Sequence, residues 1–507
     1  MGVDESEKRT VLGVFDICLF CGLDLKTIWN NLKGAWENVP PGPIFLPVLG
    51  STLTFAMGSK DVMKFPLLVI DAMAKKYGEV MRLSMGSQHM VFLSGLKAIK
   101  EFASKEETTM RPYNETLLEM YSDGEPLGMG IGIGGERWKE QRRFSARALR
   151  DLGAGKKGMD AKILQEVVHA IEDIKTRISG TQRLTKMDQY FDLPDLNIIW
   201  GLVAGIRYEY DDPAAHQQFD YLRSFLQEST AGPMTTTPWL KYIPPFKGIY
   251  WNIRHTMDAF RVLIKSVIQD QRKTFDSEHV RGYIDKFLIE QKANRGKFFT
   301  DKDLIINCQD LFIAGSETAS KTHSNCFMWL VLNPDVQLKV QEELDRVIGR
   351  ERHITMDDKI NLPYTDATMM EVRRISTPFP ITPPRTAPMD ITIQGYKIPA
   401  GVPVQMNIYS VLRGEKYFDE PDKFKPERFL SEENKVVVPE AFIPFGYGKR
   451  RCLGENLATV SNFIFYANLL QVFSFRMIDP KNPPSTLPCG GLTYGPQPFD
   501  VRVSVRE

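Results

Sequence analysis

The sequence predicts a mainly α fold with a minor β region, built as a single large domain behind a short leader. Apolar residues recur at helical spacing over many long stretches, and only a few short stretches alternate as strands do. Strands and helices do not take turns along the chain, which disfavours a doubly wound nucleotide-binding fold. With 507 residues, of which 43% are hydrophobic and 25% charged, the composition is that of an ordinary globular protein.

The first 38 residues are predicted to form a leader or a weak membrane anchor. Their apolar run, residues 11–23, contains Asp16 and is shorter than the roughly 20 residues that a membrane-spanning helix needs. No clear cleavage site of a secretory signal follows it. A proline-dense segment at 39–43 cannot be helical and marks a boundary. Residues 39–507 show no repeat and no Ser/Gly linker, so they are predicted to be one domain.

Within this domain, the expected elements follow the periodicity of the sequence. Two short strands are expected in residues 79–93, and a second strand-rich region at 389–404 contains a turn at Gln394-Gly395. A helix is also expected to begin near Pro363. The other expected helices cover residues 61–77, 135–149, 159–176, 192–206, 216–228, 250–275, 300–332 and 456–472.

The net charge limits the class of binding partner, and the cysteine content indicates the redox compartment. The chain has 64 Lys+Arg and 63 Asp+Glu, a formal net charge of +1, which speaks against a general nucleic-acid binder. Six cysteines are too few for a disulfide scaffold in a chain of this length, so a reducing compartment is the default. Each cysteine must therefore be judged by its neighbours.

Residues 444–455, PFGYGKRRCLGE, place Cys452 just before a helical stretch and after three consecutive basic residues. A thiol in this position is expected to ionise, and a thiolate is a strong ligand for iron. The alternative is a buried structural cysteine in a glycine-rich loop. The stretch resembles the haem-binding loop of the cytochrome P-450 family, Phe-x-x-Gly-x-Arg-x-Cys-x-Gly, and looks most like the animal microsomal type. The resemblance implies a haem-thiolate loop in which Cys452 binds the iron.

The helix expected at 300–332 is long enough, at about 48 Å, to cross the domain. Thr300 and Asp303 suit its N-terminus as a capping pair, and Asn333-Pro334 ends it. Its middle reads AGSET at 314–318, where a glycine costs about 1 kcal/mol and predicts a local distortion. The alternative is a solvated turn on an exposed face.

The same AGSET stretch resembles the oxygen-activation motif of the cytochrome P-450 family. The resemblance implies that Glu317 and Thr318 are catalytic residues that deliver protons. The family often has a hydroxyl residue after the threonine, whereas this chain has Ala319.

Glu371 and Arg374 lie three residues apart on one face of the expected helix. On a surface such a pair would contribute little stability. The pair and the later PERF segment at 426–429 resemble two linked motifs of the family. The resemblance implies a buried structural triad of Glu371, Arg374 and Arg428, with Arg373 facing solvent.

Trp138 and Arg142 are one helical turn apart and can face one pocket, although core packing of Trp138 is the alternative. The family uses this pair at a haem propionate. The resemblance therefore implies that the cofactor is haem b and that six residues bind it: Trp138, Arg142, Arg385, Phe445, Arg450 and Cys452.

The resemblance also implies an activity and partners. Electrons would come from NADPH through a flavoprotein reductase, with cytochrome b5 as a second possible donor, at the cytosolic face of the endoplasmic reticulum membrane. The enzyme would hydroxylate or epoxidise a small to medium lipophilic substrate. Two alternatives stay open: a reductase-independent haem-thiolate isomerase or dehydratase, and a non-enzymatic haem sensor. The segments expected to dock the reductase carry Lys139, Arg142, Arg143, Arg147, Lys449 and Arg451.

Overall fold

The computed structural model describes residues 38–43, 50–51, 66–85, 88–153, 157–228, 233–293 and 297–506. The predicted leader, apart from its last residue, lies outside these ranges. The chain divides into two compact units, which are described separately. The first contains the described residues up to Pro112 together with Pro383–Met406, and the second contains Tyr113–Thr382 and Asn407 onward. The expectation of one domain after residue 38 stays a prediction.

The first unit is built on a three-stranded sheet with the strand order β1-β2-β6. Strands β1 and β2 are antiparallel, with Val80 opposite Leu93, as the alternating sequence predicts. A second antiparallel pair, β4 and β5, turns through Gln394 and Gly395, which both have positive φ. The elements are α4 (Pro66–Tyr77), β1 (Val80–Met85), β2 (Gln88–Ser94), α5 (Leu96–Ala103), η1 (Glu106–Thr109), β4 (Ile391–Ile393), β5 (Tyr396–Ile398) and β6 (Val404–Asn407).

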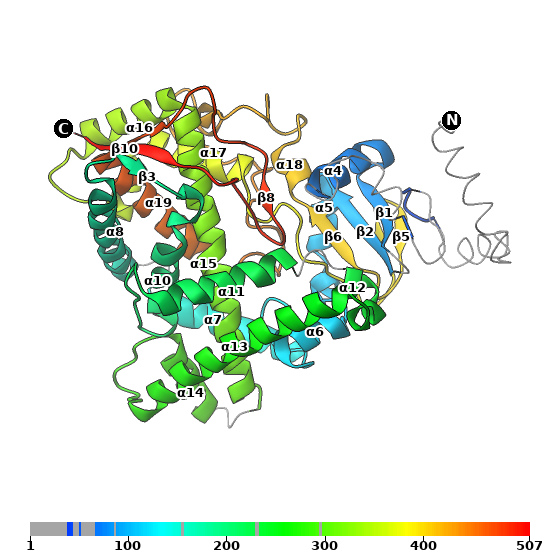
Figure 1. Ribbon diagram of the computed structural model, residues 1–507. Helices are drawn as coiled ribbons and strands as arrows, with labels where there is room; N and C mark the ends of the chain where they lie inside the picture. Colours follow the sequence, from blue (N-terminus) through cyan, green and yellow to red (C-terminus); the bar gives the residue numbers. More distant parts are fainter. Residues whose placement is uncertain are drawn as a thin grey trace. The chain divides into compact units, whose positions relative to one another are not determined.

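The second unit is mostly helical (Figure 1). Its long helices are α7 (Gly135–Asp151), α8 (Lys157–Ile178), α10 (Asp192–Val203), α11 (Pro213–Glu228), α13 (Phe246–Lys273), α14 (Tyr283–Ala293), α15 (Asp301–Leu332), α16 (Pro334–Val347), α17 (Pro363–Ile375) and α19 (Glu455–Val472). The predicted mainly α fold with a minor β region is confirmed.

Shorter elements connect and edge these helices. They are α6 (Glu115–Ser122), α9 (Met187–Tyr190), α12 (Pro233–Thr236), η2 (Pro238–Tyr242), η3 (Met356–Asn361), α18 (Tyr409–Leu412) and η4 (Pro426–Phe429). The strands are β3 (Arg183–Leu184), β7 (Phe473–Met477), β8 (Cys489–Gly490), β9 (Tyr494–Gly495) and β10 (Val501–Val505). Strand β10 lies between β3 and β7 in one small sheet, and β8 pairs with β9 in another.

Helix α15 passes through both hydrophobic cores of the second unit. Phe312, in its first half, belongs to the core that α10 and α13 line. Phe327, in its second half, belongs to the core that α8, α19 and β7 line. The Thr300 side chain accepts from the backbone N–H of Asp303, and the Asp303 carboxylate accepts from the backbone N–H of Thr300, as the sequence predicts.

Residues 314–318 lie within the continuous helix α15, and the local distortion expected there stays a prediction. The Thr318 hydroxyl donates to the Ala314 carbonyl at 2.7 Å, which satisfies it within the helix. Helix packing explains why glycine occupies position 315. A Cβ atom on Gly315 would lie 2.6 Å from the Ile199 side chain of α10, so glycine lets the two helices approach closely.

Candidate active site

The predicted haem loop folds so that the Cys452 side chain stays accessible. The Cys452 N–H donates to the Phe445 carbonyl at 3.0 Å, which closes the loop just before α19. Gly446 and Gly448 both have φ of +77°, a conformation that suits glycine. A Cβ atom on Gly446 would meet no atom within 4 Å, and the Cys452 side chain is exposed. The loop thus presents an accessible thiol at the start of a helix.

The expected ionisation of this thiol is wrong for the protein alone. Desolvation raises the pKa of Cys452 above its ordinary value, although the Gly454 backbone N–H and the cations Arg142 and Arg451 act in the opposite direction. The Cys452 thiol is accessible but has many neighbouring atoms around it, so it lies in a recess of the surface. Coordination to a metal ion deprotonates a thiol outright, so a bound iron would supply the missing stabilisation.

Helix α7 places two of the predicted residues beside this loop. The Arg142 guanidinium donates to the Arg451 carbonyl. The Arg450 guanidinium stacks on the Trp138 ring at 3.8 Å from its centroid. The same two side chains also bind residues 129–132. The Arg450 guanidinium donates to the carbonyls of Met129 and Gly132, and the Trp138 Nε1–H donates to the carbonyl of Met129. The structure therefore brings Trp138, Arg142 and Arg450 together, and their predicted contact with haem stays a prediction.

Sequence reasoning missed Asp310, which holds the segment that Arg450 binds. Its buried carboxylate accepts from the Tyr121 hydroxyl and from the backbone N–H groups of Met129 and Gly130. A Cβ atom on Gly128 would lie 2.7 Å from the Asp310 carboxylate, so glycine lets the backbone reach it. The available signals were an acid inside an apolar helical stretch and the glycine repeat GMGIGIGG at 128–135.

Glu317 and Thr318 lie side by side in the middle of α15. Glu317 is only 7% exposed, and its Oε2 atom has no hydrogen-bond partner among the described residues. Desolvation raises the pKa of Glu317 to about 7, while Lys321 and the Thr493 hydroxyl lower it and Asp192 raises it further. An acid with a pKa near neutrality can both hold and release a proton under working conditions.

The predicted structural triad is assembled and buried. Arg374 donates to both oxygens of Glu371, at 2.6 and 2.8 Å, and Arg428 Nε donates to Oε1 at 3.1 Å. The Lys425 backbone N–H also donates to Glu371. Arg373 does not face solvent as expected, because it is 6% exposed and its guanidinium lies 5.6 Å from the centre of the Phe445 ring.

The remaining predicted residue, Arg385, belongs to the first unit. It is buried, and its backbone forms a β-bridge with Val404. Its place among the cofactor-binding residues stays a prediction.

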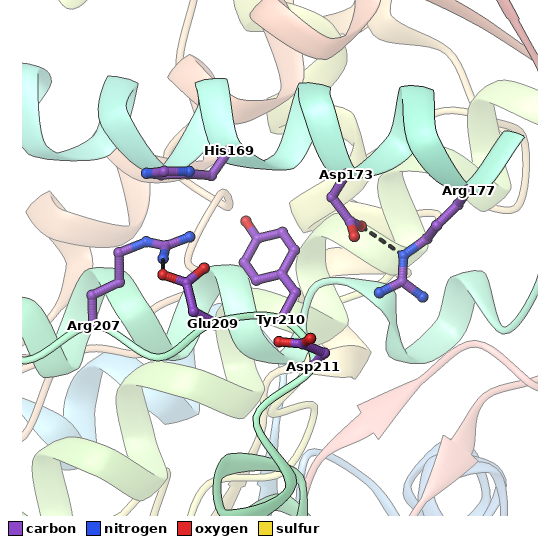
Figure 2. A pocket seen from close by; sticks show the side chains of 7 residues that line it. All are labelled: His169, Asp173, Arg177, Arg207, Glu209, Tyr210 and Asp211. Carbon is purple, nitrogen blue, oxygen red and sulfur yellow. Dashed lines mark hydrogen bonds and ion pairs between the residues drawn. The ribbon is translucent and has the colours of Figure 1, made fainter. Parts of the chain in front are cut away.

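A surface pocket elsewhere in the second unit has no predicted site residue in its lining (Figure 2). Figure 2 shows both of its arginines joined to neighbouring carboxylates, with Tyr210 between them. Arg177 pairs with Asp173 at 2.7 Å, and Arg207 pairs with Glu209 at 2.8 Å. The pocket therefore offers little net charge to a ligand. Its lining comes from α8 and the segment after α10: His169, Asp173, Arg177, Arg207, Glu209, Tyr210 and Asp211.

A mainly α unit with an accessible cysteine before α19 and an acid–hydroxyl pair on the adjoining α15 is the arrangement of a haem-thiolate enzyme. The chain matches the family model described as Cytochrome P450 over residues 40–503. It belongs to the cytochrome P450 family, and its enzyme class is that of the haem b-dependent monooxygenases.

Curated relatives align along nearly the whole chain. Cytochrome P450 2D9 of Mus musculus is 33% identical over 98% of this chain and 97% of its own length. Cytochrome P450 2D10 of the same species is 34% identical over 99% of both chains. Cytochrome P450 2U1 of Homo sapiens is 30% identical over 96% of this chain and 93% of its own.

The residues present fit the haem group of this family. The exposed Cys452 thiol offers the sulfur ligand, and the empty space over Gly446 leaves room for a flat ligand against the loop. On α15, which packs against α19, Ala314 is exposed and Ile313, Gly315, Thr318 and Ala319 are half-buried, whereas Ser316 and Glu317 are buried. This side of α15 is therefore available to face a bound group.

Proposed function

We propose that this chain is a reductase-dependent monooxygenase that hydroxylates or epoxidises a small to medium lipophilic molecule, with Cys452 as the iron ligand and with Thr318 and Glu317 as proton-delivering residues. One observation carries the proposal: a buried acid with a pKa near 7 lies directly beside Thr318, on a helix packed against the one that Cys452 precedes. The presence of this acid–hydroxyl pair favours the monooxygenase over a reductase-independent isomerase or dehydratase and over a haem sensor.

The haem, when bound, supplies dioxygen activation with two electrons. The chain's own residues would do the rest. The Thr318 hydroxyl holds a water or substrate hydroxyl in place on the exposed side of α15, and Glu317 supplies its proton. Desolvation around Glu317 keeps that proton on the carboxyl until it is drawn away. Met129 and Ile313 pack in the apolar core that the first half of α15 lines, and such residues would limit the access of bulk water.

Electrons would come from NADPH through a flavoprotein reductase, with cytochrome b5 as a second donor. Lys139, Arg143, Arg147, Lys449 and Arg451 are exposed and suit an acidic docking partner. Reversing the charges of Lys139 and Arg143 should slow the first electron transfer at low salt and leave substrate binding unchanged. An unchanged rate would place the docking face elsewhere.

We also propose residence at the cytosolic face of the endoplasmic reticulum membrane. Among the helices that the structure describes, none combines the length and the apolar character needed to cross a lipid bilayer. All of the predicted leader except its last residue lies outside the described residues, so membrane association is tested directly. Full-length protein and a variant lacking residues 1–38 are compared for sedimentation with microsomes.

The central experiment is the absorption spectrum of the reduced protein under carbon monoxide. Wild type should show the red-shifted Soret band of thiolate-ligated haem, and Cys452→Ala should lose it. Cys308→Ala and Cys489→Ala are the matched controls, since one thiol is buried and the other is exposed away from the loop. A normal band in Cys452→Ala would refute the assignment of the ligand.

Turnover separates the proposed activity from its alternatives. Purified enzyme with reductase is incubated with a library of lipophilic compounds, and oxygen consumption and products are measured with and without NADPH. Product that contains one added oxygen atom and requires NADPH supports the proposal. Rearranged or dehydrated product without NADPH would favour the isomerase or dehydratase, and no product at all would favour the sensor.

A further inference from the structure

Arg373 is a buried cation with no acidic partner in direct contact. It is 6% exposed, and no carboxylate of the described residues forms an ion pair with it. Its Nε atom has no hydrogen-bond partner, and its one hydrogen bond, from Nη2 to the Ala458 carbonyl, is long at 3.4 Å. Burial lowers the pKa of Arg373 only to about 10, so the group stays charged at neutral pH.

The two carboxylates near Arg373 are already engaged by other cations. Asp366 accepts from Lys359, and Glu455 pairs with Arg451. Both favour the charge of Arg373 only at longer range. Burying a charge without a close partner destabilises a fold unless another interaction offsets the free-energy cost. No described carboxylate forms an ion pair with Arg373 that would offset it.

The position of Arg373 indicates which group would compensate for its buried charge. Its guanidinium lies against the ring of Phe445, and the carbonyl of Phe445 accepts from the N–H of Cys452. Arg373 therefore contacts the haem loop at the residue whose carbonyl holds the backbone of Cys452. Once the Cys452 thiol binds iron, this loop would carry a negative charge that favours the buried cation.

We propose that Arg373 is a positioning residue of the haem loop whose buried charge also raises the reduction potential of the iron that Cys452 would bind. The inference rests on the proposed function, because it requires Cys452 as the ligand. Reduction of the ferric iron adds one negative charge, and a nearby cation in a poorly solvated site stabilises the reduced form. The charge would thus favour acceptance of the first electron.

The test compares three substitutions at this position with a surface control. Arg373→Gln and Arg373→Met remove the charge, and Arg373→Lys keeps it but loses the planar contact with Phe445. Arg346→Gln removes an exposed charge from α16, where solvent screens it. Midpoint potentials are measured by spectroelectrochemical titration, and ligation is followed by the reduced-CO absorption band.

We expect Gln and Met to keep the band and to shift the reduction equilibrium about tenfold toward the ferric form, which is about 59 mV for one electron. Lys and the Arg346 control should stay within about twofold of wild type. Loss of the band in Gln and Met but not in Lys would also support the proposal, because the charge would then be required to hold the loop.

Two results would overturn it. Neutral variants with a normal band and an unchanged potential would show that the charge does not act on the iron. Loss of the band in all three variants would show that the arginine is needed for folding and that its charge has no separate role. Absence of the band in wild type would instead refute the proposed function, so the two failures are distinguishable.

Discussion

Replacing Glu317 by glutamine tests the electrostatics of the site, because it removes the charge and keeps the shape. The carboxyl has a pKa of about 7 in the folded protein against an ordinary 4.5. That difference corresponds to about 3 kcal/mol against the ionised form. Below pH 4.5 the group is protonated in both folded and unfolded chains, so the cost vanishes. It grows as the pH rises from 4.5 to 7 and is fully present above 7.

The variant should therefore gain stability over wild type as the pH increases. Between pH 4.5 and pH 8 the gain should grow by about 3 kcal/mol. With an unfolding entropy of about 2.1 cal/mol/K per residue, this is an upward shift of about 3 °C in the unfolding midpoint. The measurement is thermal unfolding of both proteins across this pH range. Glu342→Gln, an exposed substitution on α16, is the control and should show no such trend.

Activity should change with the same group. A proton donor works only while protonated, so wild-type product per NADPH should fall as the pH rises through about 7. Glu317→Gln should give a lower yield that no longer depends on pH between 6 and 8. If wild type and variant share one pH profile, or if their stability difference is constant with pH, then Glu317 is not the titrating donor.

Three further perturbations address other parts of the site. Thr318→Ala should keep the reduced-CO band and NADPH consumption. Its product per NADPH should fall by about 10²-fold or less, and hydrogen peroxide per NADPH should rise in its place. Asp310→Ala leaves the Tyr121 hydroxyl and two backbone N–H groups without an acceptor, at about 1–3 kcal/mol each, and should speed haem loss to apomyoglobin more than Asp310→Asn does. Glu371→Ala leaves two buried arginines uncompensated and should destabilise folding by about 3–5 kcal/mol, seen as loss of the folded haem protein on expression, whereas Glu433→Ala on the surface should not.

Several of the long helices and the strands β1 and β2 were predictable from local signals, whereas α14, α16 and the sheet of β3, β10 and β7 were not expected. The capping pair Thr300 and Asp303 and the terminating Asn333-Pro334 define α15 within one residue of the expected range. The residues of the haem loop and the acid–hydroxyl pair could also be found, because each motif is contiguous and its chemistry requires neighbouring residues. Periodicity and short motifs carry this information directly.

What the sequence could not give depends on contacts between distant segments. The Asp310 carboxylate accepts hydrogen bonds from the backbone of residues 129 and 130, about 180 positions earlier, and no local sequence pattern predicts that pairing. The resemblance to the family implied that Arg373 faces solvent, whereas its burial follows from how α17 packs against the haem loop. The thiol of Cys452 was expected to ionise from its basic neighbours, but desolvation by the folded loop outweighs them.

The contacts of Asp310 give α15 two tasks. Through Asp310 it fixes the segment whose carbonyls hold Arg450, and Arg450 belongs to the haem loop. About two turns later it carries Glu317 and Thr318, and its second half packs on α19, the helix that follows Cys452. Because a single rigid helix carries all these groups, a change at Asp310 that moved the loop would also alter how the proton donor faces the bound group. Substitutions at Asp310 and Thr318 should therefore be non-additive in product per NADPH, although no direct contact joins the two side chains.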